Sequence, residues 1–158
     1  MKKLFIPLIA CILFASCSVH KIQGVNLNGK WTLNSVTIEG VDSSAINNYK
    51  ITLLNDVSLS CFNRSTWDMP NSGNGTYTIQ STSADCMPGV RQIYWSTSSD
   101  NNINYLQIKR LTNGQKPADV AEGYRMEITS VTNNSFTLRA PTTVDNQARN
   151  IVYSFSRL

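Results

Sequence analysis

The chain has 158 residues, of which 41% are hydrophobic, and its 14 lysines and arginines outnumber its 10 aspartates and glutamates for a formal net charge of +4. This length suffices for one domain with a sizeable core and is too short for two. Beyond residue 17 the basic side chains are scattered, with Lys109-Arg110 as their only adjacent pair, so nucleic acid is not expected as a partner.

The first sixteen residues have the pattern of an export signal. Lys2 and Lys3 form a positive start, residues 4–14 are an apolar run, and two small residues follow. The run is too short to cross a bilayer, which takes about 20 apolar residues. Residues 13–17, Leu-Phe-Ala-Ser-Cys, resemble the lipobox of bacterial lipoproteins, in which the signal is cut before a cysteine that carries the lipid anchor. Phe14 departs from the aliphatic residue usual there.

This resemblance implies a lipoprotein signal peptide at residues 1–16 and a mature chain that begins at Cys17, with palmitate among the acyl chains attached there. Removing Lys2 and Lys3 would leave 12 basic against 10 acidic groups, a net charge of +2. Residues 17–27 would form the anchor and a flexible tether, and residues 28–158 a domain close to the membrane. The expected location is the outer membrane, with the domain facing the periplasm. The alternative is an ordinary cleaved signal in which Cys17 has no special role.

From Gly29 onward, short stretches of alternating apolar and polar residues are separated by turn residues. The pattern predicts strands at 31–38, 49–54, 57–62, 65–69, 76–80, 91–97, 103–111, 123–131, 135–139 and 151–158. Residues 43–48 fit one helical turn with a serine cap, and residues 117–122 fit a long loop better than a helix. Turns are expected at Asn55-Asp56, Asn74-Gly75 and Asn133-Asn134.

The alternation gives each strand one apolar and one polar face. Eight to ten such strands predict an all-β antiparallel fold, either a closed barrel or a two-sheet sandwich. The barrel leaves no long exposed edges, and the sandwich fits the pattern almost as well.

Two cysteines remain in the predicted domain, Cys61 and Cys86. In an oxidising periplasm an isolated pair is most simply a disulfide. A metal site would need further ligands, and the only histidine, His20, lies in the predicted tether. The sequence therefore predicts a disulfide, no metal and no cofactor.

Asn28-Gly29-Lys30-Trp31 resembles the Gly-x-Trp signature of lipocalins, which are eight-stranded up-and-down barrels with a ligand cup. In lipocalins the tryptophan closes the barrel floor beneath an arginine from the last barrel strand, and Arg157 is placed for that role. The second lipocalin signature, Thr-Asp-x-x-Tyr, is absent. A more specific similarity is to the lipocalin-like domain of small Gram-negative lipoproteins. It rests on Cys61, Ser65, Trp67, Asn71, Gly75, Tyr77, Cys86, Ile93 and Trp95. Both resemblances favour the barrel over the sandwich.

Catalysis is the function with the least support. Acid and base chemistry usually needs a histidine or two carboxylates held together, and the carboxylates are spread over several turns and strands. Phosphate-binding glycine loops, HExxH and GxSxG are all missing from the sequence. We therefore expect a protein that is not an enzyme.

The barrel architecture favours binding, either as a carrier of a small hydrophobic ligand or as an interaction module that holds a partner protein through its loops. In the carrier, a cup would open at the end of the barrel away from Trp31. Its lining would be Trp67, Tyr77, Tyr94, Trp95, Met126 and Phe155. The alternative is that these side chains fill the barrel, since eight strands leave an interior just wide enough for side chains. A filled interior with an exposed aromatic loop at residues 67–74 would favour the interaction module.

Overall fold

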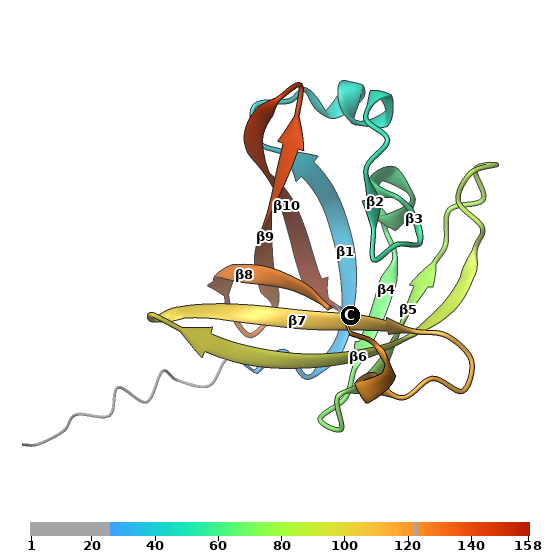
Figure 1. Cartoon of the computed structure of the whole chain (residues 1–158), viewed down its shortest axis with the longest axis vertical. Helices are drawn as coiled ribbons and strands as arrows, with labels where there is room; N and C mark the ends of the chain where they lie inside the picture. Colours follow the sequence, from blue (N-terminus) through green and yellow to red (C-terminus); the bar gives the residue numbers. More distant parts are fainter. Residues whose placement is uncertain (1–25, 122) are drawn as a thin grey trace, which may run out of the picture.

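The computed structural model describes residues 26–121 and 123–158, so the predicted signal peptide and Cys17 lie outside the described residues. Eight antiparallel strands form a closed barrel in the order β1-β10-β9-β8-β7-β6-β5-β4 (Figure 1). They are β1 (Gly29–Ile38), β4 (Thr66–Met69), β5 (Asn74–Ile79), β6 (Gly89–Asp100), β7 (Ile103–Leu111), β8 (Tyr124–Val131), β9 (Ser135–Val144) and β10 (Gln147–Arg157). The predicted all-β up-and-down barrel is confirmed, and the closed ring of strand pairs excludes the sandwich.

Strand β1 closes the ring, because it pairs with β10 along its length and with β4 through residues 29–32. Between β1 and β4 the chain forms an insertion of residues 39–65. It contains η1 (Ser43–Asn48), the hairpin of β2 (Thr52–Leu53) and β3 (Val57–Ser58), and η2 (Leu59–Phe62). Figure 1 shows this insertion at the end of the barrel where β1 ends. We call that end the mouth, and the end that contains Trp31 the sealed end.

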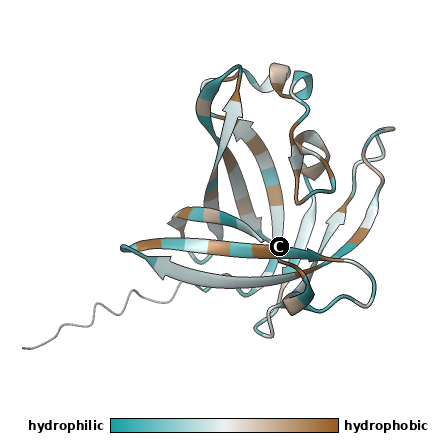
Figure 2. Ribbon diagram, viewed as in Figure 1, coloured by the Kyte–Doolittle hydropathy of each residue, from teal (hydrophilic) through white to brown (hydrophobic). Residues whose placement is uncertain are grey.

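The barrel interior is filled by the apolar phase of the strands, which Figure 2 shows as alternating bands along β1 and β7. Aromatic rings make up much of it. Phe136 and Phe155 stack with ring centroids 4.3 Å apart, and Trp67 and Tyr77 stack at 4.9 Å. Each such fully buried side chain contributes roughly 1.5 to 3 kcal/mol of hydrophobic stabilisation.

The sealed end is closed by Leu27, Trp31 and Arg157. The buried Trp31 ring packs edge-on against Phe136 with centroids 4.8 Å apart, and its Nε1 donates to the Leu27 carbonyl at 2.8 Å. The Arg157 guanidinium lies 4.6 Å from the Trp31 ring centroid and donates to the Asn28 carbonyl at 3.0 Å. Leu27 is fully buried, so the fold begins inside the segment that the sequence pattern assigned to the tether.

The turn predicted at Asn74-Gly75 lies at a different position in the structure. The left-handed residue after β4 is Gly73, with φ +79°, and Asn74-Gly75 instead begin β5. Gly73 has to be small, because a Cβ there would lie 2.8 Å from the Tyr94 ring. The 3-10 helix η1 confirms the predicted helical turn, but its cap is Asp42, whose carboxylate accepts from the Ser44 amide at 2.8 Å.

The predicted strand at 57–62 is wrong beyond Ser58. Cys61 and Phe62 are both buried, which a strand would prevent by pointing neighbouring side chains to opposite faces. The 3-10 turn of η2 places both inward. A further 3-10 turn, η3 (Pro117–Asp119), lies within the predicted long loop. None of the helices formed by the described residues has the length and apolar character needed to cross a membrane.

Candidate functional site

The mouth of the barrel is covered by the insertion rather than by the barrel wall. Its buried apolar side chains are Ile46, Leu53, Leu54, Val57, Leu59 and Phe62. The Phe62 ring lies 5.4 Å from the Tyr77 ring, so the insertion reaches the aromatic core of the barrel. A segment outside the ring of strands therefore completes the core at this end.

The tip of the insertion is a tight turn between β2 and β3. Leu54 and Asn55 have φ +56° and +50°, and the Asp56 amide donates to the Leu53 carbonyl at 3.1 Å, which makes a type I′ turn. Leucine in the left-handed region costs roughly 1 to 2 kcal/mol, which burial of the Leu54 side chain offsets. The central residues of the turn are Leu54 and Asn55, one position earlier than the predicted Asn55-Asp56. Asp56 is therefore the last residue of the turn, directly before β3.

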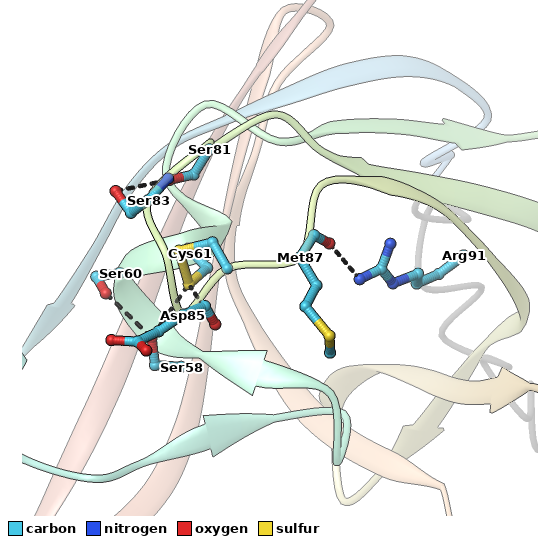
Figure 3. Close-up of a disulfide and its surroundings, with 9 residues drawn as sticks. Ser58, Ser60, Cys61, Ser81, Ser83, Asp85, Met87 and Arg91 are labelled. Atoms are coloured by element: carbon cyan, nitrogen blue, oxygen red, sulfur yellow. Dashed lines mark hydrogen bonds between the residues drawn. A yellow bond between two sulfur atoms is a disulfide. The ribbon is translucent and has the colours of Figure 1, made fainter.

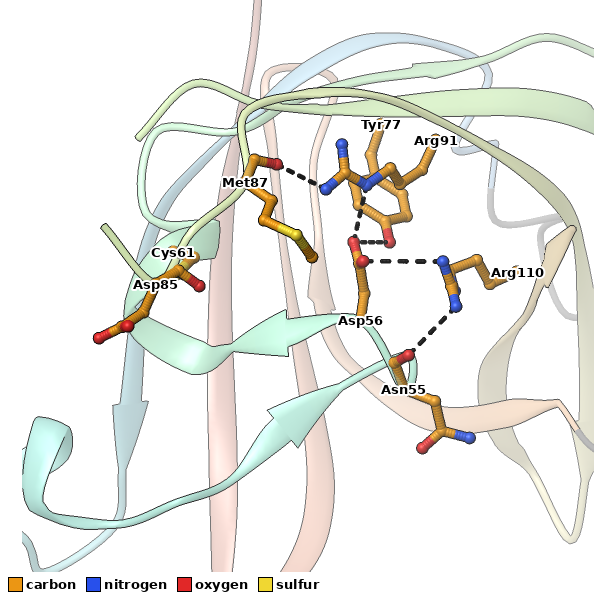
Figure 4. A network of polar contacts seen from close by, with 8 residues as sticks. All are labelled: Asn55, Asp56, Cys61, Tyr77, Asp85, Met87, Arg91 and Arg110. Atoms are coloured by element: carbon orange, nitrogen blue, oxygen red, sulfur yellow. Dashed lines mark hydrogen bonds and ion pairs between the residues drawn. The ribbon is translucent and has the colours of Figure 1, made fainter. Parts of the chain in front are cut away.

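Asp56 places its carboxylate among three donors of the barrel wall (Figure 4). Arg91 Nε and Tyr77 Oη donate to the same oxygen, Oδ2, at 3.0 and 2.7 Å. Arg110 Nη1 lies 3.6 Å from the other oxygen, Oδ1. Only 5% of the Asp56 side chain is exposed, against 15% for Arg91 and 30% for Arg110. We call these four residues the mouth cluster.

Both arginines lie on the inward phase of their strands. Arg91 is opposite Tyr77 in the pairing of β5 with β6, and Arg110 is opposite Ile93 in the pairing of β6 with β7. Since Tyr77 and Ile93 are buried in the barrel, the arginines occupy positions that the alternation reserves for the interior. The sequence prediction missed them, although one signal was present: Arg91 shares the phase of Ile93 and Trp95 and directly precedes them on that face of the strand.

Further hydrogen bonds join the insertion to the wall around the mouth cluster. The Asn55 carbonyl accepts from Arg110 Nη2 at 3.2 Å, and Asn55 Oδ1 accepts from Tyr124 Oη of β8 at 2.6 Å. Arg91 Nη2 also donates to the Met87 carbonyl at 2.6 Å. The turn is thus held by polar groups from four consecutive strands, β5 to β8, in a ring around the opening.

Burial and the hydrogen bond to Asp56, in that order, raise the pKa of Tyr77 far above its ordinary value. The phenol therefore keeps its proton throughout the neutral range and acts as a donor to a carboxylate. Two cationic side chains and one neutral donor then face a single anion. The arrangement is suited to binding a carboxylate.

The predicted disulfide between Cys61 and Cys86 is confirmed. It joins η2 to the loop between β5 and β6, with the two Cα atoms 5.3 Å apart (Figure 3). A cross-link that spans 25 residues restricts the unfolded chain by about 3.5 kcal/mol in the loop-entropy model. In the folded protein it ties one end of the insertion to the wall and leaves the β2–β3 turn attached by non-covalent contacts.

The predicted ligand-lining residues do not form a cup at the mouth. Trp67 is opposite Trp31 in the strand pairing, and Phe155 lies 5.6 Å from Trp67 between ring centroids, so both belong to the sealed half of the barrel. Trp95 lies beside Gly73 in the same half, where its amide donates to the Gly73 carbonyl at 2.8 Å. The predicted location at the end away from Trp31 is therefore wrong for these three residues.

The other predicted lining residues are distributed differently. Met126 is buried on β8, two residues from Tyr124, and Tyr94 lies on the outward phase of β6. Tyr77 alone belongs to the mouth cluster. Two hollows, of about 610 and 500 Å³, lie beside the insertion and on the outer wall, and none of the predicted lining residues borders either of them. Tyr94 and Trp95 border a smaller hollow, of about 300 Å³, beside Leu27 and Gly73 in the sealed half.

No family model, curated protein or solved structure matches this chain. The lipocalin resemblance therefore rests on the residues quoted from the sequence, to which the structure adds the barrel architecture. Within residues 26–121 and 123–158, no three histidine, cysteine, aspartate or glutamate side chains gather as a metal site would require. The mouth cluster is the candidate site that the geometry singles out.

Proposed function

We propose that this protein is a membrane-anchored, lipocalin-like binding protein, not an enzyme, which takes up a small hydrophobic ligand through the mouth of its barrel. The fold supports this, because a closed eight-stranded barrel has one interior and two ends. At the sealed end the first and last strands meet over Trp31. Entry at the mouth requires that the insertion move and that the ligand take the place of side chains that fill the interior in the closed form.

The observation that carries this proposal is the ionic character of the mouth. A permanent closure would be most stable if it were apolar, because buried ion pairs cost desolvation that their attraction barely repays. Here Arg91 and Arg110 point into the barrel and both pair with Asp56 of the insertion, whose single negative charge offsets one of their two positive charges. Contacts of this kind can exchange with water or with another anion, which suits a closure that opens.

Opening would expose an apolar space. Leu54, Val57 and Phe62 of the insertion are buried against the barrel, and their displacement would uncover the wall beneath them. The Cys61–Cys86 disulfide would keep the insertion attached. Ligand sites in proteins are concave and apolar with a few polar groups, and an opened mouth would have this composition.

The test uses a neutral apolar fluorescent probe whose binding quenches tryptophan emission, together with native mass spectrometry of protein extracted from membranes. We expect probe binding and a retained ligand as added mass. Asp56→Asn should raise the probe affinity several-fold by weakening the closure. Asp100→Asn is the matched control, since Asp100 pairs with Arg125 at 3.3 Å on the surface. Absence of probe binding in every variant would contradict the carrier proposal.

The anchor is supported by the lipobox-like residues 13–17 and by the path of the chain. Leu27 enters the fold at the sealed end, so a lipid on Cys17 would hold that end towards the outer membrane and leave the mouth facing the periplasm. Several acyl chains on Cys17 would bind the membrane far more firmly than one. Cys17→Ala removes the residue that carries them, so the protein should move into the soluble fraction. Unchanged membrane association of that variant would contradict the anchor.

A non-enzymatic interaction module is the second candidate, and the filled interior favours it. The partner would bind the outer wall, where Pro70, Leu111, Lys116 and Pro117 border the hollow of about 500 Å³. Trp67, the aromatic side chain of the loop that the sequence suggested for this role, is buried, whereas residues 70–72 of that loop are exposed. A barrel that stays closed in the probe experiment would make this the leading account.

A further inference from the structure

Three donors of the barrel wall converge on one carboxylate, and that carboxylate comes from the insertion. Arg91, Arg110 and Tyr77 belong to β6, β7 and β5, which are neighbouring strands of one wall. In the described part of the chain, neither arginine has an ion pair other than that with Asp56. Movement of the insertion would therefore leave two guanidinium groups and a phenol facing the barrel without an anion.

We propose that Arg91, Arg110 and Tyr77 form the binding site for the carboxylate of an amphipathic ligand with an apolar chain, and that Asp56 occupies this site while the mouth is closed. The inference rests on the proposed function and adds the chemical class of the ligand to it. Asp56 acts as an internal competitor, which the ligand carboxylate replaces on binding.

The geometry favours a carboxylate over other anions. Arg91 Nε and Tyr77 Oη converge on one oxygen, and Arg110 Nη1 faces the second, so the donors match a planar group with two oxygens (Figure 4). Charged hydrogen bonds of this kind are shorter and stronger than neutral ones. The polar groups already bind a carboxylate in this structure, and a ligand carboxylate would keep the same contacts.

The surroundings favour an apolar chain behind that carboxylate. The Tyr77 ring lies between Phe62 of the insertion, at 5.4 Å, and Trp67 of the barrel core, at 4.9 Å. A ligand carboxylate at the Tyr77 hydroxyl would therefore have its chain beside the position that Phe62 and Leu54 occupy in the closed form. The chain would take the place of these side chains, which are buried in the closed form.

Competition sets the direction of each effect. Asp56 is tethered next to the arginines, so its local concentration is high, and a ligand binds only the fraction of molecules in which the insertion has moved. Asp56→Asn removes the competing charge while it keeps the shape of the side chain. It should therefore raise the affinity for a carboxylate ligand, whereas loss of either arginine should lower it.

The experiment compares dodecanoate with dodecanol, which differ in the carboxylate and share the chain, by calorimetric titration of the protein. We expect Arg91→Gln and Arg110→Gln each to lower the affinity for dodecanoate by about tenfold, and not to lower the affinity for dodecanol. Arg139→Gln is the matched control, because Arg139 forms its ion pair with Glu127, at an N–O distance of 2.8 Å, and this pair does not lie at the mouth. Dodecyl phosphate tests whether a phosphate is preferred.

Thermal unfolding gives a second measurement that does not depend on folding of the arginine variants. Asp56→Asn leaves the arginines without their anion, so dodecanoate should raise the unfolding temperature of this variant more than that of the wild type, and the corresponding gain with dodecanol should be smaller.

The outcomes separate the two proposals. If dodecanoate and dodecanol bind with equal affinity, and neither arginine variant changes that affinity, the carboxylate site is overturned and the carrier proposal stays intact. Tighter binding of dodecyl phosphate than of dodecanoate would overturn the choice of a carboxylate. Failure of every chain-bearing ligand to bind any variant would overturn both proposals.

Discussion

At the sealed end the barrel is closed by residues of its own first and last strands, Trp31 and Arg157, whereas at the mouth it is closed by Asp56 from a separate insertion. The first closure is an aromatic ring buried in the core with one cation over its face. The second is a carboxylate between two inward arginines. In the function proposed above, the first closure stabilises the barrel and the second opens reversibly.

The largest effect is expected at the sealed end. Trp31→Ala should lower the free energy of unfolding by about 3 to 5 kcal/mol, because it empties the space of a fully buried ring. Denaturant titration measures this loss. Tyr94→Ala, which removes a ring on the outward phase, is the control and should cost much less. A similar loss for both variants would contradict the assignment of Trp31 to the structural closure.

Removal of the disulfide should come next. Cys61→Ser combined with Cys86→Ser should cost about 3.5 kcal/mol, since the unfolded chain regains the freedom of the closed loop. The same variant should increase amide hydrogen exchange in residues 49–62 more than in β1 and β10. Equal increases at both ends would show that the disulfide does not act on the insertion. Intact-mass measurement after alkylation, with and without reductant, checks the bond itself.

Asp56→Ala should cost about 2 to 3 kcal/mol in denaturant unfolding, because it leaves two half-buried arginines without their anion. Combining it with Arg91→Met should recover part of the loss, since the double variant removes one uncompensated charge. Arg91→Met is also measured alone. If the loss of stability in the double variant equals the sum of the losses in the two single variants, the two residues are not coupled.

Tyr77→Phe should have the smallest effect, about 1 kcal/mol at neutral pH, for the loss of one hydrogen bond. Burial raises the pKa of Tyr77 in the folded protein. Above a pH of about 10 an unfolded tyrosine loses its proton while the folded one keeps it, so wild-type stability should fall as the pH rises through that range. The fall should be shallower in Tyr77→Phe. Identical slopes in thermal unfolding from pH 8 to 11 would contradict the burial of a protonated phenol in the mouth cluster.

The sequence was sufficient for the barrel because its main signal is local. Alternation marks each strand and predicts an antiparallel all-β fold, and the lipocalin resemblance then favoured the up-and-down barrel over the sandwich. The disulfide was also predictable, since only two cysteines remain in the domain once Cys17 is assigned to the lipid. The strand predicted at 57–62 failed because a short 3-10 turn has no periodicity that distinguishes it from an alternating strand.

The mouth cluster could not be predicted because it depends on register and on the path of the insertion. Asp56 and Arg91 are 35 positions apart in the sequence, and no local pattern brings them together. The predicted ligand residues were large aromatic side chains, and most of them serve the core of the sealed half. A charge on the inward phase of a strand, such as Arg91 beside Ile93, was the more informative feature.

Amide hydrogen exchange resolved by residue tests most directly whether the mouth opens independently of the sealed end. We expect the amides of β2 and β3 to exchange through an opening of lower free energy than global unfolding, and those of β1 beside Trp31 to exchange only through global unfolding. Dodecanoate should slow exchange in residues 49–62, and Asp56→Asn should accelerate it. Exchange of both regions at one common free energy, unchanged by the ligand and by the variant, would contradict a mouth that opens.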